Sequence, residues 1–319
     1  MPLDRILIIK LGALGDFIYA LGPMRAIRDH HSNAEILLLT RKTFIELGRR
    51  SQIFDDIWVD TEPKPWNLRK LRDLRRKLIS GHFSRIYDLQ TSDRTGFYYR
   101  LMGPSKRPEW SGIVRGCSHY HHYKRPTLIH SQDRQRKQLQ IAGIHRVPDP
   151  DLSFMEDGLE NLELPNRFAL LVPGSSPSMK IKRWPAQNYG KIANFLVKEG
   201  LIPIILGTEN DLDSVNIILE KCPGAVNFVE KTTIFQIPSL ARKATICIGN
   251  DTGPMHLIAL SKCPTISLFS SSSFPEKAAP RGAHIVVLAR EQLDSLEVQD
   301  VKKAFTNLLY GQETHSESQ

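Results

Sequence analysis

Short apolar runs alternate with helix-like segments along this chain, and the alternation occurs in two successive series. In the first half the strand-like runs are "RILIIK", "AEILLLT", "DDIWVD" and "SRIYDL". In the second half they are "FALLVPG", "IPIILG", "TICIGND", "PTISLF" and "AHIVVLA". Strands that alternate with helices form βαβ units, whose strands lie parallel in one sheet. We therefore expect an α/β protein with two mostly parallel sheets.

The length and composition of the chain allow two such domains. The chain has 319 residues, of which 41% are hydrophobic, and domains commonly span about 100–200 residues. The stretches "RVPDPDLSF" and "EDGLENLELPN" indicate a linker. We place an N-terminal Rossmann-like domain at 1–160 and a C-terminal one at 161–319, with a terminal helix at about 296–310 and a flexible tail at 311–319.

Two segments of the first half need separate treatment. A helix is expected from about Asp16 to His30, and Pro23 within it should kink the helix or end its first part, because proline lacks an N–H donor. Residues 104–130 contain Pro, Gly, Trp and the run "SHYHHY", and their composition indicates irregular structure.

Positive charge is concentrated in the first half of the chain. The net charge is +9, and residues 1–160 hold 27 Lys and Arg against 19 Asp and Glu. The run "RKLRDLRRK" at 69–77 has six basic residues and one acid. Three interpretations of this run are open: a solvated helix face, a surface for an anionic acceptor or lipid, and, third, nucleic acid, for which no known motif is present.

Cysteine and histidine give no sign of a disulfide framework or a metal centre. The four cysteines, none in a CxxC pair, are Cys117, Cys222, Cys247 and Cys263. Their scatter argues for a reducing compartment and against a zinc site. The histidines of "SHYHHY" at 118–123 lack a Cys or carboxylate at ligand spacing, so a loop is favoured over a metal site. No apolar stretch is long enough to span a membrane.

The stretch "KLGALGD" after the first strand carries the first candidate site. Gly12 and Gly15 have neither the GxGxxG spacing nor the Gly-Lys-Ser/Thr of a phosphate loop, and Asp16 follows them in an apolar neighbourhood. Asp16 could cap the helix, belong to a nucleotide-binding turn, or act as a base at the carboxyl end of the strand, where α/β proteins bind ligands. The turn alone favours the cap.

Three loops of the second half also follow strands. The loop "GNDTG" precedes a helix, whose amino end suits a diphosphate, and "PGSSPSMKIKRWP" at 173–185 offers hydroxyls and three basic residues for phosphate oxygens. In "LGTEND" at 206–211, Glu209 is placed to accept a bond from a ribose hydroxyl. Each loop also has a structural interpretation without a ligand. The loop "GNDTG" could be an ordinary capped βα loop, 173–185 a solvated basic loop, and 206–211 the amino end of a helix.

Taken together and in this order, the stretches resemble glycosyltransferase family 9, the ADP-heptose:lipopolysaccharide heptosyltransferases. The resemblance rests on "ILIIKLGALGDFIYALGPMRAIR", "YDLQTSDRTG" at 87–96, "PGSS…KRWP", "LGTEND" and "GNDTGPMHLIAL" at 249–260. It implies a GT-B fold, in which two Rossmann-like domains with parallel sheets face a central cleft. It also implies inverting transfer without a metal ion or other cofactor, with an ADP-sugar as co-substrate.

The resemblance assigns roles to individual residues. Asp16 corresponds to the general base, Glu209 to the ribose contact and Asp251 to the donor-sugar contact. The remaining donor nucleotide and phosphate contacts would be Ser175, Ser176, Lys182 (with Lys180 as its rival), Thr252 and Gly253. Binding of the acceptor would fall to Arg69, Lys70, Arg72, Arg75, Arg76 and Arg94.

The leading hypothesis is therefore transfer of a heptose from ADP-heptose to an anionic, lipid A-linked inner-core acceptor. The expected location is cytoplasmic, with peripheral contact at the inner face of the bacterial inner membrane, and no nucleic acid partner is expected. The alternatives are a related glycosyltransferase with another nucleotide sugar or acceptor, a nucleotide-dependent oxidoreductase and a non-catalytic glycolipid-binding module. The sequence leaves open the sugar, the acceptor position, the oligomeric state and the role of 104–130.

Overall fold

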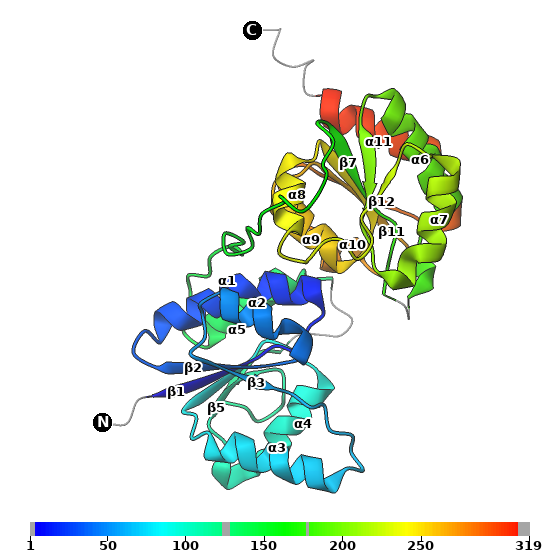
Figure 1. Cartoon of the computed structure of the whole chain (residues 1–319). Helices are drawn as coiled ribbons and strands as arrows, with labels where there is room; N and C mark the ends of the chain where they lie inside the picture. The colour runs from blue at the N-terminus through cyan, green and yellow to red at the C-terminus, as the bar shows by residue number, and fades with distance from the viewer. Residues whose placement is uncertain (1–3, 123–127, 177–178, 312–319) are drawn as a thin grey trace, which may run out of the picture. The chain divides into compact units, whose positions relative to one another are not determined.

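A computed structural model of the chain describes residues 4–122, 128–176 and 179–311. The chain divides into two compact units, Met1–Phe154 and Met155–Gln319, which are drawn in Figure 1. This division falls six residues before the boundary that we place from the sequence at 160/161. Each unit is built on its own parallel sheet of six strands.

The sheet of the first unit has the strand order β3-β2-β1-β4-β5-β6, and all neighbours pair in parallel. Its strands are β1 (Arg5–Ile9), β2 (Glu35–Thr40), β3 (Asp56–Val59), β4 (Arg85–Asp88), β5 (Glu109–Gly112) and β6 (His119–Tyr120). The order runs one way from β1 to β3 and the other way from β4 to β6. The strand order therefore reverses between β1 and β4, which is where open α/β sheets bind ligands.

Helices cover both faces of this sheet. They are α1 (Leu14–His30), α2 (Ile45–Arg50), α3 (Leu68–Ser80), α4 (Asp93–Met102) and α5 (Ser131–Ile141). Figure 1 shows α1, α2 and α5 on one face and α3 and α4 on the other. The basic helix α3 folds against the sheet because Leu71, Leu74 and Leu78 repeat at helical spacing and are buried, while its charged residues face outward.

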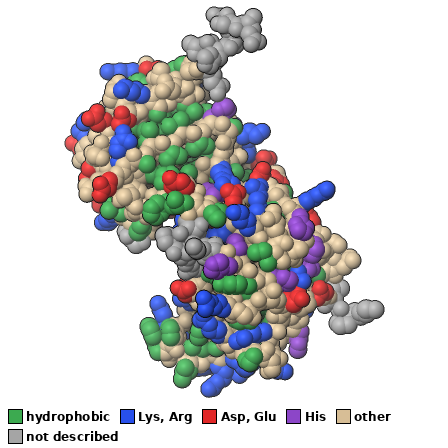
Figure 2. Space-filling model, turned by 180° about the vertical axis from the view of Figure 1, so that it is seen from behind, with side chains coloured by type: hydrophobic (Ala, Val, Ile, Leu, Met, Phe, Trp, Pro, Cys, Tyr) green, Lys and Arg blue, Asp and Glu red, His purple; other side chains and the backbone are tan. Residues whose placement is uncertain are grey.

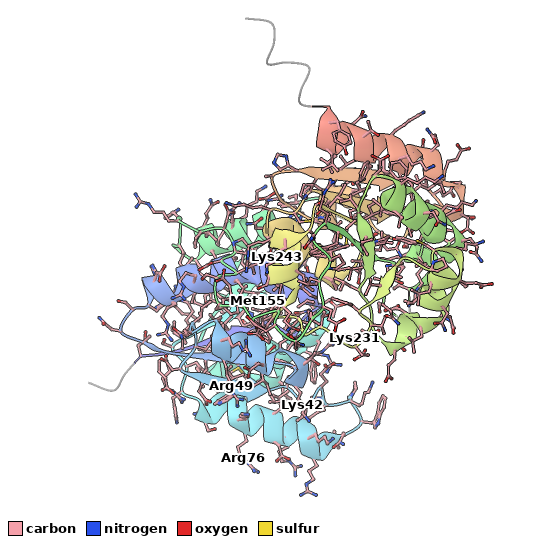
Figure 3. The ribbon with its side chains drawn as sticks, turned by 45° about the horizontal axis from the view of Figure 1, so that its top comes forward. Lys42, Arg49, Arg76, Met155, Lys231 and Lys243 are labelled. Atoms are coloured by element: carbon pink, nitrogen blue, oxygen red, sulfur yellow. The ribbon has the colours of Figure 1, made fainter. Side chains whose placement is uncertain are left out.

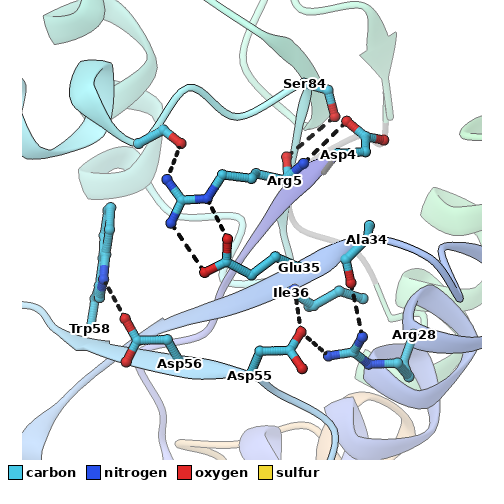
Figure 4. Close-up of polar contacts among 11 residues, drawn as sticks. Asp4, Arg5, Arg28, Ala34, Glu35, Ile36, Asp55, Asp56, Trp58 and Ser84 are labelled. Atoms are coloured by element: carbon cyan, nitrogen blue, oxygen red, sulfur yellow. Dashed lines mark hydrogen bonds and ion pairs between the residues drawn. The ribbon is translucent and has the colours of Figure 1, made fainter. Parts of the chain in front are cut away.

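Ion pairs at the amino edge of the sheet help to set the register of its strands (Figure 4). Arg5 of β1 lies opposite Glu35 of β2, and the guanidinium donates to this carboxylate at 2.8 and 3.3 Å. Asp55, just before β3, accepts from the Ile36 N–H at 2.7 Å and pairs with Arg28 of α1 at 2.6 Å. These contacts tie β1, β2, β3 and α1 together at the edge remote from the candidate site.

The structure corrects three expectations for this unit. The helix α1 is continuous through Pro23, so of the two expected effects, a kink or an end of the first segment, the second is wrong. Residues 104–130 were expected to be irregular, but β5 and β6 lie within them and extend the sheet. The run "SHYHHY" is likewise not wholly a loop, since His119–Tyr120 form β6; residues 123–127 lie outside the described residues.

The sheet of the second unit has the order β12-β11-β10-β7-β8-β9, again with parallel neighbours throughout. Its strands are β7 (Phe168–Val172), β8 (Ile202–Ile205), β9 (Val226–Asn227), β10 (Ile246–Asn250), β11 (Thr265–Phe269) and β12 (Ile285–Ala289). The reversal of strand order falls between β7 and β10. The five strands expected from the sequence are present, and β9 is additional.

The helices of the second unit are α6 (Ala186–Lys198), α7 (Leu212–Lys221), α8 (Ile237–Lys243), α9 (Gly253–Leu260), α10 (Pro275–Ala278) and α11 (Val298–Tyr310). Figure 1 shows α6, α7 and α11 on one face of the sheet and α8, α9 and α10 on the other. The helix α11 agrees with the terminal helix expected at about 296–310. Of the tail expected at 311–319, residues 312–319 lie outside the described part of the chain.

None of the helices in the described ranges is both long and apolar enough to cross a membrane.

Candidate active-site loops at the two strand-order reversals

The first candidate site begins where β1 and β4 end side by side. The register places Ile9 beside Asp88, so the segments that follow, from Lys10 and from Leu89, leave the sheet together. The Leu11 N–H donates to the Gln90 side chain at 2.9 Å, which joins the two segments. The glycine turn of the sequence and the stretch "YDLQTSDRTG" therefore meet at one point of the first unit.

Gly12 allows the turn to pass close to a neighbouring ring. Its φ is +117°, and a Cβ at this position would lie 2.6 Å from Cε2 of Phe44. A side chain is therefore excluded both by the backbone conformation and by the space. Gly15, the second glycine of the motif, is buried in the first turn of α1.

Asp16 is the third residue of α1 and is half-buried. Ala13 occupies the N-cap position, and within 4–122, 128–176 and 179–311 the Asp16 carboxylate has no hydrogen bond or ion pair. The capping bond that the turn alone favours is therefore not made. The first turn of a helix still favours a negative charge through the partial positive charge of its N–H groups.

Lys10 lies buried beside this carboxylate. Its ammonium donates to the Leu89 carbonyl at 3.2 Å and the residue is 2% exposed. Burial lowers the pKa of Lys10, and the negative charge of Asp16 opposes that lowering. Lys10 comes directly after β1, so the sequence already offers it as a basic neighbour of Asp16, and the structure brings the two charges close enough to interact.

Asp88, the last residue of β4, is a second acid that the sequence analysis did not select. It is fully buried, and burial raises its pKa to about 6. Its Oδ1 accepts the N–H groups of Gln90 at 3.1 Å and Thr91 at 2.9 Å, which shapes the turn after β4. Asp88 therefore supports the loop beside Asp16 from inside the sheet edge.

The basic helix α3 starts near the same edge and runs away from it. It follows β3 and leads back to β4, so only its first turn lies at the carboxyl edge of the sheet. Arg69 and Arg76 are seven residues apart, which corresponds to about 10 Å along a helix. Arg75 donates to the Leu101 carbonyl at the far end of α4, and the exposed Arg76 points outward in Figure 3. The predicted acceptor residues on α3 thus lie at different distances from Asp16.

Arg94, the other predicted acceptor residue, lies in the first turn of α4 and belongs to a small charged cluster. Glu62, which follows β3, lies 3.8 Å from Arg94 and forms an ion pair with Arg41, which follows β2. Arg41 is a basic residue of this edge that the sequence analysis passed over. Its position after β2 is the signal that would have found it.

In the second unit, Asn250 joins the loops at the reversal of strand order. It ends β10, and its side chain donates to the Pro173 carbonyl at 2.6 Å. The Asn250 Oδ1 accepts the Trp184 N–H at 3.2 Å and the Tyr189 hydroxyl at 3.0 Å. The buried side-chain amide of Asn250 therefore holds the loop after β7 against the loop after β10. The sequence motifs did not point to this residue.

Lys182 and Asp251 form an ion pair across these two loops. Their atoms Nζ and Oδ2 are 2.6 Å apart, and both side chains are largely buried. Lys180 is exposed, so of the two rival lysines only Lys182 is brought to Asp251. Thr252 occupies the N-cap position of α9 without a side-chain capping bond, and Gly253 begins the helix.

The two serines of "PGSS" differ in their surroundings. The Ser175 hydroxyl is buried, donates to the Met179 carbonyl at 3.0 Å and accepts from Arg183 at 3.1 Å. Ser176 is exposed. Ser175 is thus engaged within its own loop, whereas Ser176 lies at the surface of the loop.

Glu209 lies in the turn after β8, and the carboxylate that caps this turn is Asp211. The Asp211 side chain accepts from both the N–H and the hydroxyl of Thr208, at 3.0 and 3.1 Å. Glu209 is exposed, and its backbone N–H donates to Glu230 at 3.1 Å. Asp211 therefore makes the capping contacts at this helix amino end, and the Glu209 side chain remains exposed at the surface.

No group of three His, Cys, Asp or Glu side chains suited to a metal ion occurs in the part of the chain that the structure describes.

Comparison with known proteins places the chain in a family. The sequence model of glycosyltransferase family 9 (heptosyltransferase) matches residues 71–306. The lipopolysaccharide core heptosyltransferase OpsX of Haemophilus influenzae is 22% identical over 291 residues, 86% of this chain and 80% of that protein.

Solved structures give the same result for the fold. A glycosyltransferase of family 9 from Veillonella parvula has a TM-score of 0.79 at 20% identity, covering 97% of this chain and 98% of that one. The Escherichia coli heptosyltransferase WaaC, solved with ADP-2-deoxy-2-fluoro heptose, has a TM-score of 0.72 at 16% identity and covers 95% and 99%. The two Rossmann-like units have the GT-B fold, and the chain belongs to glycosyltransferase family 9, the heptosyltransferase family, and is a glycosyltransferase.

Proposed function

We propose that the protein transfers a heptose from ADP-heptose to an anionic inner-core acceptor of lipopolysaccharide. The family supports heptosyl transfer, and the relatives named for lipopolysaccharide core synthesis and solved with an ADP-heptose analogue support the donor and the acceptor. The observation that carries the proposal is the state of Asp16. It is a half-buried carboxylate in the first turn of α1, at the reversal of strand order, and its oxygens are not engaged by any of the described residues.

In the proposed reaction Asp16 is the general base. The acceptor hydroxyl attacks the anomeric carbon of the heptose, the bond from that carbon to the diphosphate oxygen breaks, and the hydroxyl proton passes to Asp16. Attack from the face opposite the leaving ADP inverts the anomeric configuration. A positioned base typically contributes about 10²–10⁴-fold to such a step.

The second unit offers groups for the leaving diphosphate. Lys182, the exposed Ser176 and the amino end of α9 at Thr252 and Gly253 supply positive charge and hydrogen-bond donors. We assign Asp251 to the heptose and Glu209 to the ribose. The proposal gives no step to a metal ion, because these groups can carry the charge that develops on ADP.

The acceptor is assigned to the carboxyl edge of the first unit. Arg69 and Lys70 in the first turn of α3, together with Arg94, offer cationic groups near that edge, and Arg72, Arg75 and Arg76 continue the charge along the helix. Figure 2 shows Lys and Arg side chains gathered at the lower end of this unit. An anionic glycolipid at the inner membrane surface, contacted peripherally, is the partner that this charge favours.

The test is transfer by the Asp16→Asn variant. Release of ADP from ADP-heptose in the presence of acceptor should fall by about 10²–10⁴-fold, since asparagine cannot take the proton. The dissociation constant of ADP should stay within about twofold, because Asp16 belongs to the other unit. Asp29→Asn, an exposed carboxylate on the same helix, is the matched control and should transfer normally.

Each part of the proposal has an outcome that contradicts it. Near-normal turnover by Asp16→Asn removes this residue from the chemistry. Retained anomeric configuration in the product excludes a single inverting displacement, and loss of activity on chelation that Mg²⁺ or Mn²⁺ restores excludes metal independence. Transfer from a UDP-, GDP- or CMP-sugar but not from ADP-heptose would assign another donor.

A further inference from the structure

The loops after the neighbouring strands β7 and β8 are joined by a nearly buried ion pair. Arg183 follows the turn Lys180–Lys182, and Asp211 ends the turn that starts at Thr208. The Arg183 Nη2 lies 2.8 Å from the Asp211 Oδ1, and the two side chains are 15% and 7% exposed. Neither residue has a role in the proposed chemistry.

The guanidinium of Arg183 also donates hydrogen bonds to the loop after β7 and to the turn after β8. Its Nε donates to the Ser175 hydroxyl and its Nη2 to the Ser175 carbonyl, both at 3.1 Å. Its Nη1 donates to the Asn210 carbonyl at 3.4 Å. All three nitrogens of Arg183 therefore donate to protein groups, so the interpretation of this loop as a phosphate site applies to its lysines.

The second oxygen of Asp211 shapes the turn that carries Glu209. The Oδ2 atom accepts the N–H and the hydroxyl of Thr208, so the carboxylate is bonded to Arg183 on one side and to its own turn on the other. Glu209 is the residue directly after Thr208. Its backbone is thus fixed by the same carboxylate that holds Arg183.

Two glycines leave the space that this carboxylate occupies. A Cβ on Gly174 would lie 2.6 Å from the Asp211 Oδ2, so a side chain there would displace the carboxylate from its contacts with Arg183 and Thr208. A Cβ on Gly207 would lie 3.3 Å from the same atom. Both motifs, "PGSS" and "LGTEND", therefore contain a glycine where Asp211 packs against the backbone.

We propose that Arg183 and Asp211 form a positioning brace for the nucleoside diphosphate of the donor. The brace fixes the loop of Ser175 and Ser176 against the turn of Glu209 before the ligand arrives. A site that is ordered in advance binds more tightly, because binding does not have to order the loops. Arg183 is a positioning residue and leaves the diphosphate to Lys182. This inference rests on the proposed function and assigns residues that it does not use.

The experiment separates positioning from plain stability by a double variant. Arg183→Gln alone leaves the Asp211 carboxylate buried and unpaired, which lowers the melting temperature. Arg183→Met combined with Asp211→Asn removes both charges, keeps an oxygen for Thr208, and should restore much of the melting temperature. If the pair positions the loops, the double variant still binds ADP about tenfold more weakly in titration calorimetry.

Steady-state kinetics and a conservative variant complete the test. The KM for the donor should rise in the double variant while the KM for the acceptor stays unchanged. Arg183→Lys keeps the positive charge but loses the paired hydrogen bonds from the guanidinium to Ser175. Its affinity for ADP should lie between those of the wild type and the double variant. Arg290→Met removes one partner of the exposed pair with Asp300 in the same unit, and should leave ADP affinity unchanged.

The outcomes distinguish this inference from the proposed function. Wild-type protein that does not bind ADP overturns the proposed donor, and the brace with it. Wild-type protein that binds ADP while the folded double variant binds it equally well overturns the brace alone. Recovery of ADP affinity in parallel with the melting temperature also overturns it, since the pair would then act only through stability.

Discussion

Two carboxyl groups at the carboxyl edge of the first sheet lie in opposite surroundings. Asp88 is fully buried at the end of β4, with a pKa raised to about 6. Asp16 is half-buried at the start of α1, and no described residue occupies its oxygens. Asp88 therefore shapes the loop after β4, which leaves Asp16 as the acid for the proposed proton transfer.

The raised pKa of Asp88 predicts a pH dependence of stability. A carboxyl whose folded pKa lies above its unfolded value of about 3.9 stabilises the fold below that value, and this contribution is lost as pH rises through about 6. Two pKa units correspond to about 3 kcal/mol. Asp88→Asn should therefore remove a fall of up to about 3 kcal/mol in the free energy of unfolding between pH 4 and pH 7.

Urea unfolding at both pH values measures this difference. Asp73→Asn, which changes an exposed carboxyl on α3, should show the same pH dependence as the wild type. An Asp88→Asn variant that loses as much stability as the wild type between pH 4 and pH 7 would show that Asp88 does not titrate in this range.

Residue positions at the ends of strands were predictable, but their partners were not. Strand-turn-helix transitions mark the ligand-binding edge of a parallel sheet and point to the loops that carry Asp16, Lys182, Glu209 and Asp251, whereas the choice of Lys182 and Asp251 within their loops rests on the family resemblance. The role of Asn250 depends on β10 lying beside β7, which no local pattern states. Asp211 had a local signal, the Thr208-x-x-Asp211 capping pattern, that was not used.

At the scale of single elements, the direction of α3 places its basic residues at different distances from the candidate site. Its first turn lies at the carboxyl edge of the sheet and its last turn near the opposite edge, since it links β3 to β4. Arg69 and Arg76 are both exposed and lie on the same side of the helix, two turns apart. They form a matched pair for testing which end meets the acceptor.

Charge reversal at these two arginines should have unequal effects. Arg69→Glu should raise the acceptor KM by about tenfold, whereas Arg76→Glu should raise it less than about twofold, because charges separated by about 10 Å in water are screened. The donor KM should change in neither variant. Equal effects at both positions would assign the whole helix to the acceptor, and no effect at either would make α3 a solvated face.

Strands with an apolar run were found from the sequence even where they are short, such as the four-residue β3 and β4, but the strands β5 and β6 were missed. The strand β5 has only four residues, "EWSG", and β6 has two, so neither shows the apolar run of a buried strand. Both are held by pairing with neighbours in the sheet, which is a tertiary effect. The helix α1 tolerates Pro23 because buried residues on either side pack it against the sheet.

At the scale of the whole molecule, charge is distributed unevenly between residues 1–160 and residues 161–319. The excess of basic residues in 1–160 accompanies the basic helix and the arginines at the edge of the first sheet. The second half, residues 161–319, holds 16 Lys and Arg against 15 Asp and Glu, which is almost neutral. An anionic surface would therefore attract the protein through its first unit.

Binding to lipid vesicles tests this expectation. The protein should sediment with vesicles rich in phosphatidylglycerol at low salt and be released at about 0.5 M NaCl, since each nearby basic residue contributes about 1 kcal/mol. Vesicles of phosphatidylcholine alone are the control and should bind little. Equal binding to both kinds of vesicle, or binding that salt does not weaken, would contradict an electrostatic contact.

The two glycines that flank the Asp211 carboxylate also bear on how new donor preferences could arise. Gly174 and Gly207 belong to different loops, yet both backbones are shaped around one side chain. If either loop were replaced by the corresponding loop of another enzyme, its backbone would no longer match the position of the Asp211 side chain. A change of donor preference would therefore require coordinated substitutions in residues 173–185 and 206–211.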